Sequence, residues 1–245
     1  VSLYTGHTGS TLDCHYPRVL LGDVVTQRRE RLEPNRWPDF SFGYLGLEHV
    51  TGQSGLLEGF KPSLGRSIHS QSGVFRPGDV LYGRLRPYLN KVYAAWGPLS
   101  IGICSGEFLV LTPNAKKVRP LFLRELLASG EVLRAVTEMQ LGSALPRLHV
   151  GDLLALRVPI PPLAVQEGVE RGLRSAREGL AEQQRAARAL PLTIRETFEE
   201  CLRSGAEFAL PPRAVRADAS WPAALPPDYE PRIRSRGRPV LAPSI

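Results

Sequence analysis

The chain reads GDVLYGRLRPYLNKV over residues 78–92, and the predicted fold is built around this stretch. It begins with a Gly-Asp turn and continues through Val-Leu-Tyr at residues 80–82, residue types that favour a pleated, partly buried surface. Gly83 and Pro87 then interrupt the strand pattern. We therefore expect a strand that leads into an exposed loop.

The loop carries side chains that suit recognition more than bond breaking. Arg84 and Arg86 lie two residues apart, so on an extended chain they project from the same face. Each guanidinium can clamp a phosphate or the O6/N7 edge of guanine. Asn90 can pair with an adenine edge, Tyr88 adds a flat face and a hydroxyl, and Lys91 adds a point charge. The alternative is that the arginines are solvated surface charges and that Tyr88 caps the core.

Three further blocks accompany this stretch. They are YLGLEHV at 44–50, ICSGEFLVLTP at 103–113 and LPRLHVGDLLALRVPIPPLAVQEGV at 145–169. In this order, the four blocks resemble the target-recognition domain of type I restriction-modification specificity subunits, and the last resembles the point where that domain runs into its spacer helix. The resemblance spans most of residues 17–200. One departure is Gly106, where the family usually has threonine.

The resemblance implies a mixed α/β target-recognition domain with a twisted sheet at residues 17–160. A long, coiled-coil-forming spacer helix is expected to follow at residues 161–204. Residues 1–16 show no periodicity and are expected to form a flexible N-terminus. Residues 205–245 are rich in Pro, Ala and Arg, a composition typical of a disordered basic tail.

By the same resemblance, the chain would be a sequence-specific DNA-binding subunit without catalytic residues. It would read one half of a bipartite target in double-stranded DNA and dock a modification (methyltransferase) subunit and a restriction/translocase subunit. S-adenosylmethionine, ATP and Mg are implied for those partners, and no cofactor or metal is expected in this chain. The residues expected to contact DNA are Lys61, Ser63, Arg66, Arg84, Arg86, Tyr88, Asn90, Lys91 and Arg147.

The first three of these residues lie in a Gly- and Ser-rich excursion at residues 52–73. Recognition residues commonly occupy loops on a rigid scaffold. An ordinary mobile surface loop is the alternative. Arg147 resembles a basic position that the family keeps near DNA. Four arginines at residues 28–36 are either phosphate contacts or a solvated cluster. Glu48 and Glu107 are expected to have a structural role, pairing with nearby arginines or accepting hydrogen bonds from the main chain.

The spacer helix carries a narrow apolar stripe with spacings of three and four residues, typical of a coiled-coil seam. From residue 163 to residue 190 it would span about 42 Å at about 1.5 Å per residue. Pro191 is expected to stop or kink it. We expect the stripe to pair with a second such helix, in a homodimer or with a second specificity half, and a homodimer would read an inverted repeat. The pairing residues are Val169, Leu173, Ala176, Leu180, Ala187, Leu190, Ile194 and Phe198.

The remaining patterns predict local elements. Residues 18–25 favour a strand and a turn, and residues 42–50 favour a strand. Residues 119–140 favour two short helices with Ser129 as a cap between them, and residues 153–160 favour a closing strand. The helices are expected to pack the core of the domain.

Charge, composition and cysteine spacing restrict the possible functions further. The chain has 245 residues, a net charge of +7 and a pI near 9.7, which favours an anionic partner such as nucleic acid. Its three cysteines are far apart, which argues against a zinc ribbon or a disulfide framework and favours a reducing, cytoplasmic setting. The family resemblance implies that this is the cytoplasm of a bacterium or archaeon. No membrane span and no catalytic motif is evident. Two alternatives remain: a fragment of a single-chain restriction-methyltransferase enzyme, and a helical adaptor without sequence-specific DNA binding.

Overall fold

The computed structural model describes residues 15–97, 99–140, 145–204, 225–234 and 239–241. They fall into two compact units. One holds the described residues up to 167 together with those from 225 onward, and the other holds residues 168–204. Most of the predicted flexible N-terminus lies outside the described residues.

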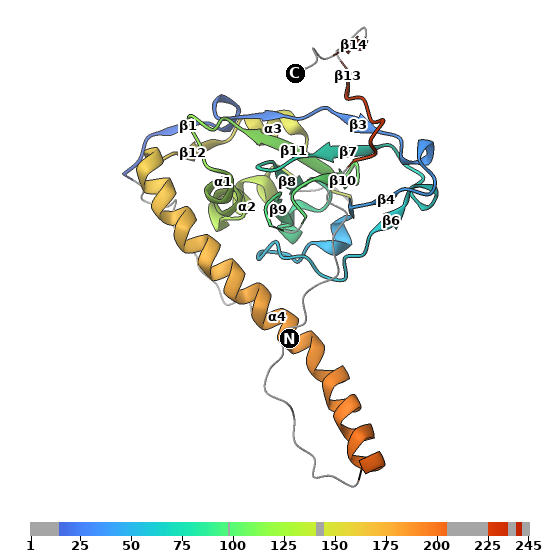
Figure 1. Cartoon of the computed structure of the whole chain (residues 1–245). Coiled ribbons are helices and arrows are strands. Elements are labelled where there is room, and N and C mark those ends of the chain that lie inside the picture. The colour runs from blue at the N-terminus through green and yellow to red at the C-terminus, as the bar shows by residue number, and fades with distance from the viewer. Residues whose placement is uncertain (1–14, 98, 141–144, 205–224, 235–238, 242–245) are drawn as a thin grey trace. The chain divides into compact units, whose positions relative to one another are not determined.

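Strand β8 (Val80–Gly83), which lies between β11 and β9 in Figure 1, separates two hydrophobic cores. Its side chains alternate across the pleat, so Val80 and Tyr82 face one core while Leu81 faces the other. Its neighbour β11 (Phe108–Pro113) repeats this alternation, with Leu109 and Leu111 on the first side. Both faces of this part of the sheet are buried, and residues 80–82 and 108–111 are accordingly apolar. The strand predicted at residues 80–82 is confirmed, but it is fully buried where a partly buried surface was expected.

This first sheet is antiparallel, with the order β2-β11-β8-β9, where β2 is Val25–Gln27 and β9 is Val92–Ala94. The second sheet has the order β3-β7-β10-β5 and contributes to the second core. Its strands are β3 (Arg31–Leu32), β7 (Ser72–Phe75), β10 (Gly102–Cys104) and β5 (Tyr44–Leu45), and only β10 and β5 are parallel. Two sheets therefore share the second core.

Helices cover the other face of the first sheet. They are α1 (Pro120–Leu127) and α2 (Gly130–Glu138), and the Oγ of Ser129 accepts a hydrogen bond from the Val132 amide at 3.4 Å. The two predicted helices and their cap are confirmed. The predicted closing strand at 153–160 was wrong in part, because α3 (Val150–Leu154) precedes β12 (Arg157–Pro159). A short apolar run does not distinguish a buried helix from a strand.

Strand β12 pairs with β1 (Arg18–Leu20), and β4 (Ser41–Phe42) pairs with β6 (Ser63–Leu64). The single strand predicted at residues 42–50 is not formed. These residues are divided among β4, β5 and the 3-10 helix η3 (Leu47–His49). Four other 3-10 turns complete the connections: η1 (Leu21–Asp23), η2 (Pro34–Arg36), η4 (Gly65–Ser67) and η5 (Pro87–Leu89).

A buried charge network joins the two sheets. Asp79 accepts two hydrogen bonds from the Arg28 guanidinium at 2.7 and 3.1 Å, one from the Arg76 amide at 2.8 Å and one from the Thr112 hydroxyl at 2.8 Å. Glu30 pairs with Arg76 at 2.8 Å and lies 3.5 Å from Arg28. Burial lowers the pKa of Arg28, but Asp79 and Glu30 outweigh this and raise it overall. Arg28 therefore has neither of the two roles predicted for the basic cluster at 28–36, phosphate contact or solvated charge, because its guanidinium is bound to Asp79.

Part of the predicted tail is ordered against the domain. Leu225 and Tyr229 pack on the apolar cluster that contains Leu32 and Phe42. The Trp37 indole donates to Asp228 at 2.6 Å, and the Tyr229 hydroxyl donates to Glu30 at 3.0 Å. Strands β13 (Arg232–Arg234) and β14 (Pro239–Leu241) then form an antiparallel pair. The prediction of disorder was therefore wrong for these residues, because apolar and aromatic side chains among the prolines supply contacts.

Helix α4 runs from Leu163 to Ser204 without interruption and contains Pro191. Of the two effects expected of Pro191, a stop or a kink, the stop is excluded, because helical structure continues on both sides of it. Proline removes one main-chain hydrogen bond and crowds the carbonyl four residues earlier, but neither effect ends the helix here. At about 1.5 Å per residue, its 42 residues extend over about 63 Å.

Candidate nucleic-acid interface

Three of the predicted DNA-contacting arginines meet where β8 ends. Beyond Gly83, the Arg84 amide donates to the carbonyl of Glu107, and Leu85 forms a bridge with Arg147. The Arg86 amide then donates to Pro146 at 2.8 Å. Segments 84–86 and 146–148 are therefore joined side by side, which brings Arg84, Arg86 and Arg147 to one end of the first sheet.

The chain then makes a tight turn, residues 86–90, which we call the tip. Its first and last residues, Arg86 and Asn90, are left-handed, with φ of 48° and 50°. The tip is held by main-chain hydrogen bonds from Leu89 to Arg86 and from Asn90 to Pro87, each 2.9 Å long. Between these ends Tyr88 and Leu89 remain exposed, by 48% and 42%. The tip presents one cation, one aromatic ring and one aliphatic side chain to solvent.

Asn90 does not have the role predicted for it. Its side chain is only 1% exposed, and its amide nitrogen donates to the Ala128 carbonyl at 2.8 Å. A side chain in that position cannot reach a base edge, so the prediction that it reads adenine was wrong. Lys91 is also engaged, because its ammonium donates to the Leu47 carbonyl at 2.7 Å. Both side chains fix neighbouring segments to the tip.

Arg147 is held by an acidic partner. Its guanidinium forms two hydrogen bonds with the Glu107 carboxylate, at 2.6 and 3.1 Å. The pairing predicted for Glu107 with an arginine is thus confirmed. A phosphate would compete with this carboxylate for Arg147, because both anions fit the same planar donor pair. The Nε of Arg84 is buried and lacks a hydrogen-bond partner among the described residues.

The remaining predicted DNA-contacting residues belong to different elements. Ser63 lies in β6, and Lys61 is exposed just before it. Arg66 lies in η4, where it forms an exposed ion pair with Asp39 at 2.6 Å. No hydrogen bond or ion pair among the described residues joins this group to the tip. The fold thus distributes the predicted DNA-contacting residues over two regions, the end of β8 and the segment around β6 and η4.

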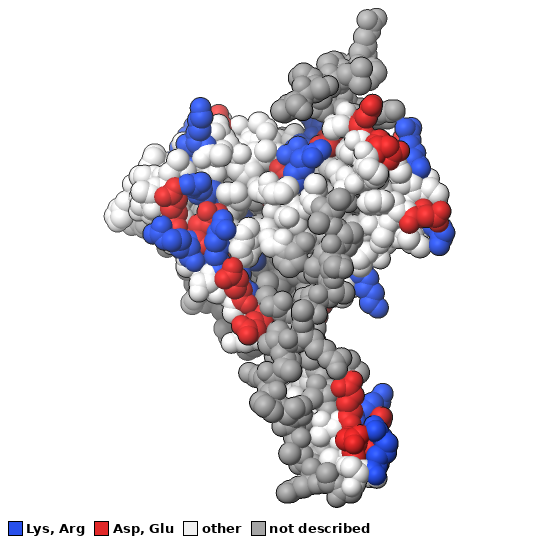
Figure 2. Space-filling model, viewed as in Figure 1, with Lys and Arg blue, Asp and Glu red and all other residues white. Residues whose placement is uncertain are grey.

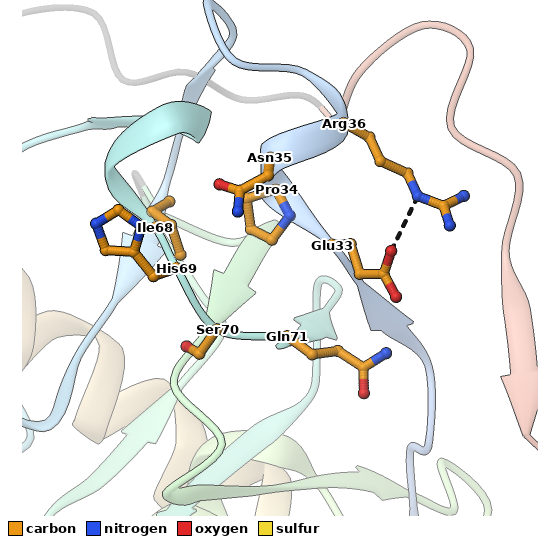
Figure 3. Close-up of a pocket in the computed structure, with 8 residues that line it drawn as sticks. All are labelled: Glu33, Pro34, Asn35, Arg36, Ile68, His69, Ser70 and Gln71. Atoms are coloured by element: carbon orange, nitrogen blue, oxygen red, sulfur yellow. Dashed lines mark hydrogen bonds and ion pairs between the residues drawn. The ribbon is translucent and has the colours of Figure 1, made fainter.

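A polar pocket of about 280 Å³ lies next to the second region (Figure 3). One side comes from η2 and the residue before it, where Glu33 and Arg36 are ion-paired at 3.0 Å. The other side comes from residues 68–71. The amide and imidazole groups of Asn35, His69 and Gln71 supply donors and acceptors there. The pocket offers several weak polar contacts and no concentrated charge.

Sequence reasoning missed the support of the tip. Arg124 of α1 is 2% exposed and donates to the main-chain carbonyls of Val92 and Gln53. The Gln53 amide in turn donates to the Asn90 carbonyl at 2.9 Å. Gly55 is required beside it, because its φ is 61° and any Cβ would lie 2.0 Å from the Val92 carbonyl oxygen. The sequence feature that could have indicated this role is an arginine between the leucines of a predicted core helix.

Replacing Arg124 with alanine is expected to lower the free energy of unfolding by about 3 kcal/mol, because it leaves buried carbonyls without a donor and opens a cavity. Urea unfolding followed by circular dichroism measures the change. Arg134→Ala on the exposed face of α2 is the matched control and should change it by less than about 0.5 kcal/mol. Equal effects of the two substitutions would contradict the supporting role.

The positive charge belongs to the α/β domain. Residues 17–160 contain 18 Lys and Arg against 12 Asp and Glu, whereas residues 161–204 contain seven of each. On the face shown in Figure 2, basic side chains alternate with acidic ones. The positive charge therefore does not form a continuous basic surface on this face. The arginines at the tip and beside it are a local group of basic residues.

The described residues contain no cluster of histidine, cysteine and acidic side chains suited to a metal ion. In the same part of the chain, no helix is long and apolar enough to cross a bilayer. Cys104 is fully buried and Cys201 is partly exposed, and both are free thiols.

Burial raises the pKa of the Cys104 thiol to about 12. At pH 8 its thiolate fraction should therefore be roughly a thousandfold below that of an ordinary cysteine. We expect iodoacetamide to leave Cys104 unlabelled in the folded protein and to label it in urea, as read by peptide mass spectrometry. Labelling of Cys104 as fast as Cys201 without denaturant would contradict this assignment.

The predicted seam on α4 is largely exposed. Val169, Leu180, Leu190 and Ile194 are each between 40% and 47% exposed, and Phe198 is 54% exposed. Ala176 and Ala187 are also exposed, and Leu173 is partly so. An isolated helix gains little from apolar side chains in water, because most helix stability in proteins comes from packing of an apolar face.

No protein-family model matches the chain. Among curated proteins, it is similar to the specificity subunit of the type I restriction enzyme EcoDI from Escherichia coli. The identity is 27% over 128 residues, which cover 52% of this chain and 28% of that protein. The HindI specificity subunit from Haemophilus influenzae is 25% identical over 155 residues, covering 61% of this chain and 32% of that protein.

Solved structures agree with this similarity. The HsdS subunit from Thermoanaerobacter tengcongensis matches with a TM-score of 0.59 and 26% identity, over 82% of this chain and 53% of that one. A chain from a structural study of assembly and conformational transition in the type I R-M system matches with the same score and identity, over 89% and 53%. The chain thus spans about half the length of the solved chains that it matches, and their fold confirms the predicted mixed α/β class.

Proposed function

Because the chain is a homologue of the specificity subunits of type I restriction enzymes, as its sequence motifs predicted, we propose that its α/β domain binds double-stranded DNA. The domain reads one half of a bipartite target and contributes no catalytic group. The observation that supports this proposal is that the segments carrying Arg84, Arg86 and Arg147 lie side by side next to the tip, where Tyr88 is exposed.

The chemistry of this end of the sheet supports base reading. Guanidinium groups bind the O6 and N7 of guanine through two hydrogen bonds, and phosphates through the same planar donors. The tip is fixed to the main chain of three other segments, so little order has to be gained on binding. Lys61 and Arg66, on the second region, contribute phosphate contacts that position the duplex.

Helix α4 supplies the second part of the proposed function. Its exposed seam pairs with a second helix of the same kind, either in another copy of the chain or in a second specificity half, and so sets the distance between two recognition domains. The paired helices also dock the modification and restriction subunits. Methylation and cleavage, with their cofactors S-adenosylmethionine, ATP and Mg, are reactions of those partners.

Selection from a random duplex library tests the DNA-binding part. The full 245-residue chain is incubated with the library, and bound DNA is recovered and sequenced. We expect one short motif to be enriched, with affinity that falls as salt rises because counterions are released from phosphates. Binding without enrichment of any motif would contradict base reading, and would favour the helical adaptor over a specificity subunit.

Light scattering tests the helix pairing. Wild type at concentrations of tens of micromolar is expected to reach about twice the monomer mass of 27.0 kDa. Leu180→Glu with Ile194→Glu should return it to the monomer, because two charges enter the apolar seam. Arg177→Glu, which changes a charge outside the seam, is the control. A wild-type monomer would overturn the homodimer and leave pairing with a different second half.

A further inference from the structure

The tip exposes two large apolar side chains next to its one cation, Arg86. Tyr88 and Leu89 are the central residues of a turn whose ends are Arg86 and Asn90. Single exposed apolar residues are ordinary on protein surfaces. Here an aromatic and an aliphatic side chain are adjacent, on a turn that projects beyond the end of β8.

The conformation of the tip is costly and held firmly. Both left-handed residues carry side chains, and one of them precedes a proline, a combination that the backbone disfavours. Gly52 allows the neighbouring loop to approach, because a Cβ there would lie 2.6 Å from the Leu89 carbonyl oxygen. With Asn90 anchored to Ala128, the turn cannot relax to bury its apolar side chains. Strain maintained in this way is found where a protein must present a fixed shape.

Two classes of partner suit an apolar pair beside arginines. The centre of a protein-protein interface is depleted of lysine and acidic residues but enriched in tyrosine and arginine. Arg84 and Arg86 lie on the same segment as the apolar pair, and Arg147 is joined to that segment by a main-chain bridge. Apolar side chains with adjacent arginines also match proteins that insert a wedge between base pairs while binding the flanking phosphates. The DNA binding proposed above favours duplex DNA, and docking of a protein is an outcome of the test.

We propose that Tyr88 and Leu89 form a wedge that enters a base step of the target duplex and unstacks it. This inference rests on the proposed DNA binding and names how the tip reads its target. Part of the specificity then comes from the ease with which a step opens, since pyrimidine-purine steps unstack more readily than others. The arginines hold the phosphates on either side.

Fluorescence of 2-aminopurine tests the wedge. The base analogue is quenched when stacked, and it is placed in turn at each adenine-compatible position of the duplex recovered by selection. The full chain alone is then added, without methyltransferase. We expect the fluorescence to rise several-fold at one step, and no rise for the variant Tyr88→Ser with Leu89→Ser. That variant should also bind about 5- to 150-fold more weakly, in keeping with the loss of base stacking.

Two variants control for other causes. Tyr88→Phe keeps the ring and should retain the fluorescence rise. Leu20→Ser, at a residue 39% exposed on β1, removes an apolar side chain away from the tip and should change neither signal. Because the side chains at 88 and 89 are exposed, the melting temperature of the double variant should match wild type.

The outcomes separate the wedge from the function on which it rests. Wild type that binds its selected duplex without a rise at any step, or a rise that the double serine variant keeps, overturns the wedge and leaves DNA binding intact. A double variant with normal DNA signals but lost binding to a methyltransferase subunit overturns it in favour of a protein-docking patch. Failure of wild type to bind any duplex overturns both proposals.

Discussion

Replacing Asp79 with alanine is expected to lower the free energy of unfolding by about 3 to 5 kcal/mol. The carboxylate is 1% exposed and accepts hydrogen bonds from Arg28, from the Arg76 amide and from Thr112. Its loss leaves a guanidinium partly buried without its main partner, and the desolvation of that charge is no longer offset. Chemical denaturation monitored by tryptophan fluorescence measures the change.

An exposed pair provides the control for this substitution. Asp39 forms its ion pair with Arg66 at the surface, so Asp39→Ala should cost less than about 1 kcal/mol. The double variant Arg28→Met with Asp79→Leu removes both charges and should recover part of the loss. If Asp79→Ala and Asp39→Ala prove equally mild, the network does not hold the two sheets together.

Replacing Arg84 and Arg86 with alanine is expected to weaken binding to the selected duplex by about 1 to 3 kcal/mol for each bidentate base contact removed. The effect should be largest on the selected sequence and small on unrelated DNA, because base contacts carry specificity and phosphate contacts do not. Fluorescence anisotropy at two salt concentrations measures both quantities.

Arg86 needs a further control because its backbone is left-handed. Arg86→Gly removes the guanidinium while easing the strained conformation, so it should lose affinity without losing stability. Lys116→Ala removes an exposed charge beyond Pro113, at the opposite end of β11 from the tip, and should leave sequence preference unchanged. Full affinity in the double alanine variant would contradict base reading by this segment and would favour a helical adaptor.

The parts of the fold that local sequence determines were predicted well. The strand at 80–83 and the helices on either side of Ser129 follow from residue types within a few positions. The structure of residues 150–160 was not predicted well, because a short apolar run adopts a helix or a strand according to what it packs against.

In the candidate site, too, local sequence predicted some features, and others depend on contacts between distant parts of the chain. The sequence placed Arg84, Arg86 and Tyr88 correctly at a strand end, since their spacing follows the chain. It misassigned Asn90 because the anchor of that side chain, the carbonyl of Ala128, lies 38 residues away and is brought near only by the fold. For the same reason the sequence did not reveal the supporting role of Arg124. It also did not reveal the hydrogen bond between Tyr229 and Glu30, which are 199 residues apart in the chain.

The tip is held by main-chain hydrogen bonds and by the side chains of Asn90, Lys91 and Arg124, and none of these bonds involves the side chains of Tyr88 or Leu89. Support of this kind does not depend on which side chains occupy positions 88 and 89. Natural selection can therefore exchange those two residues, and with them the preferred DNA sequence, without rebuilding the scaffold. A library randomised at these positions is expected to keep the melting temperature of wild type while its members diverge in the duplexes that they select. Such a tip separates the evolution of specificity from the evolution of stability.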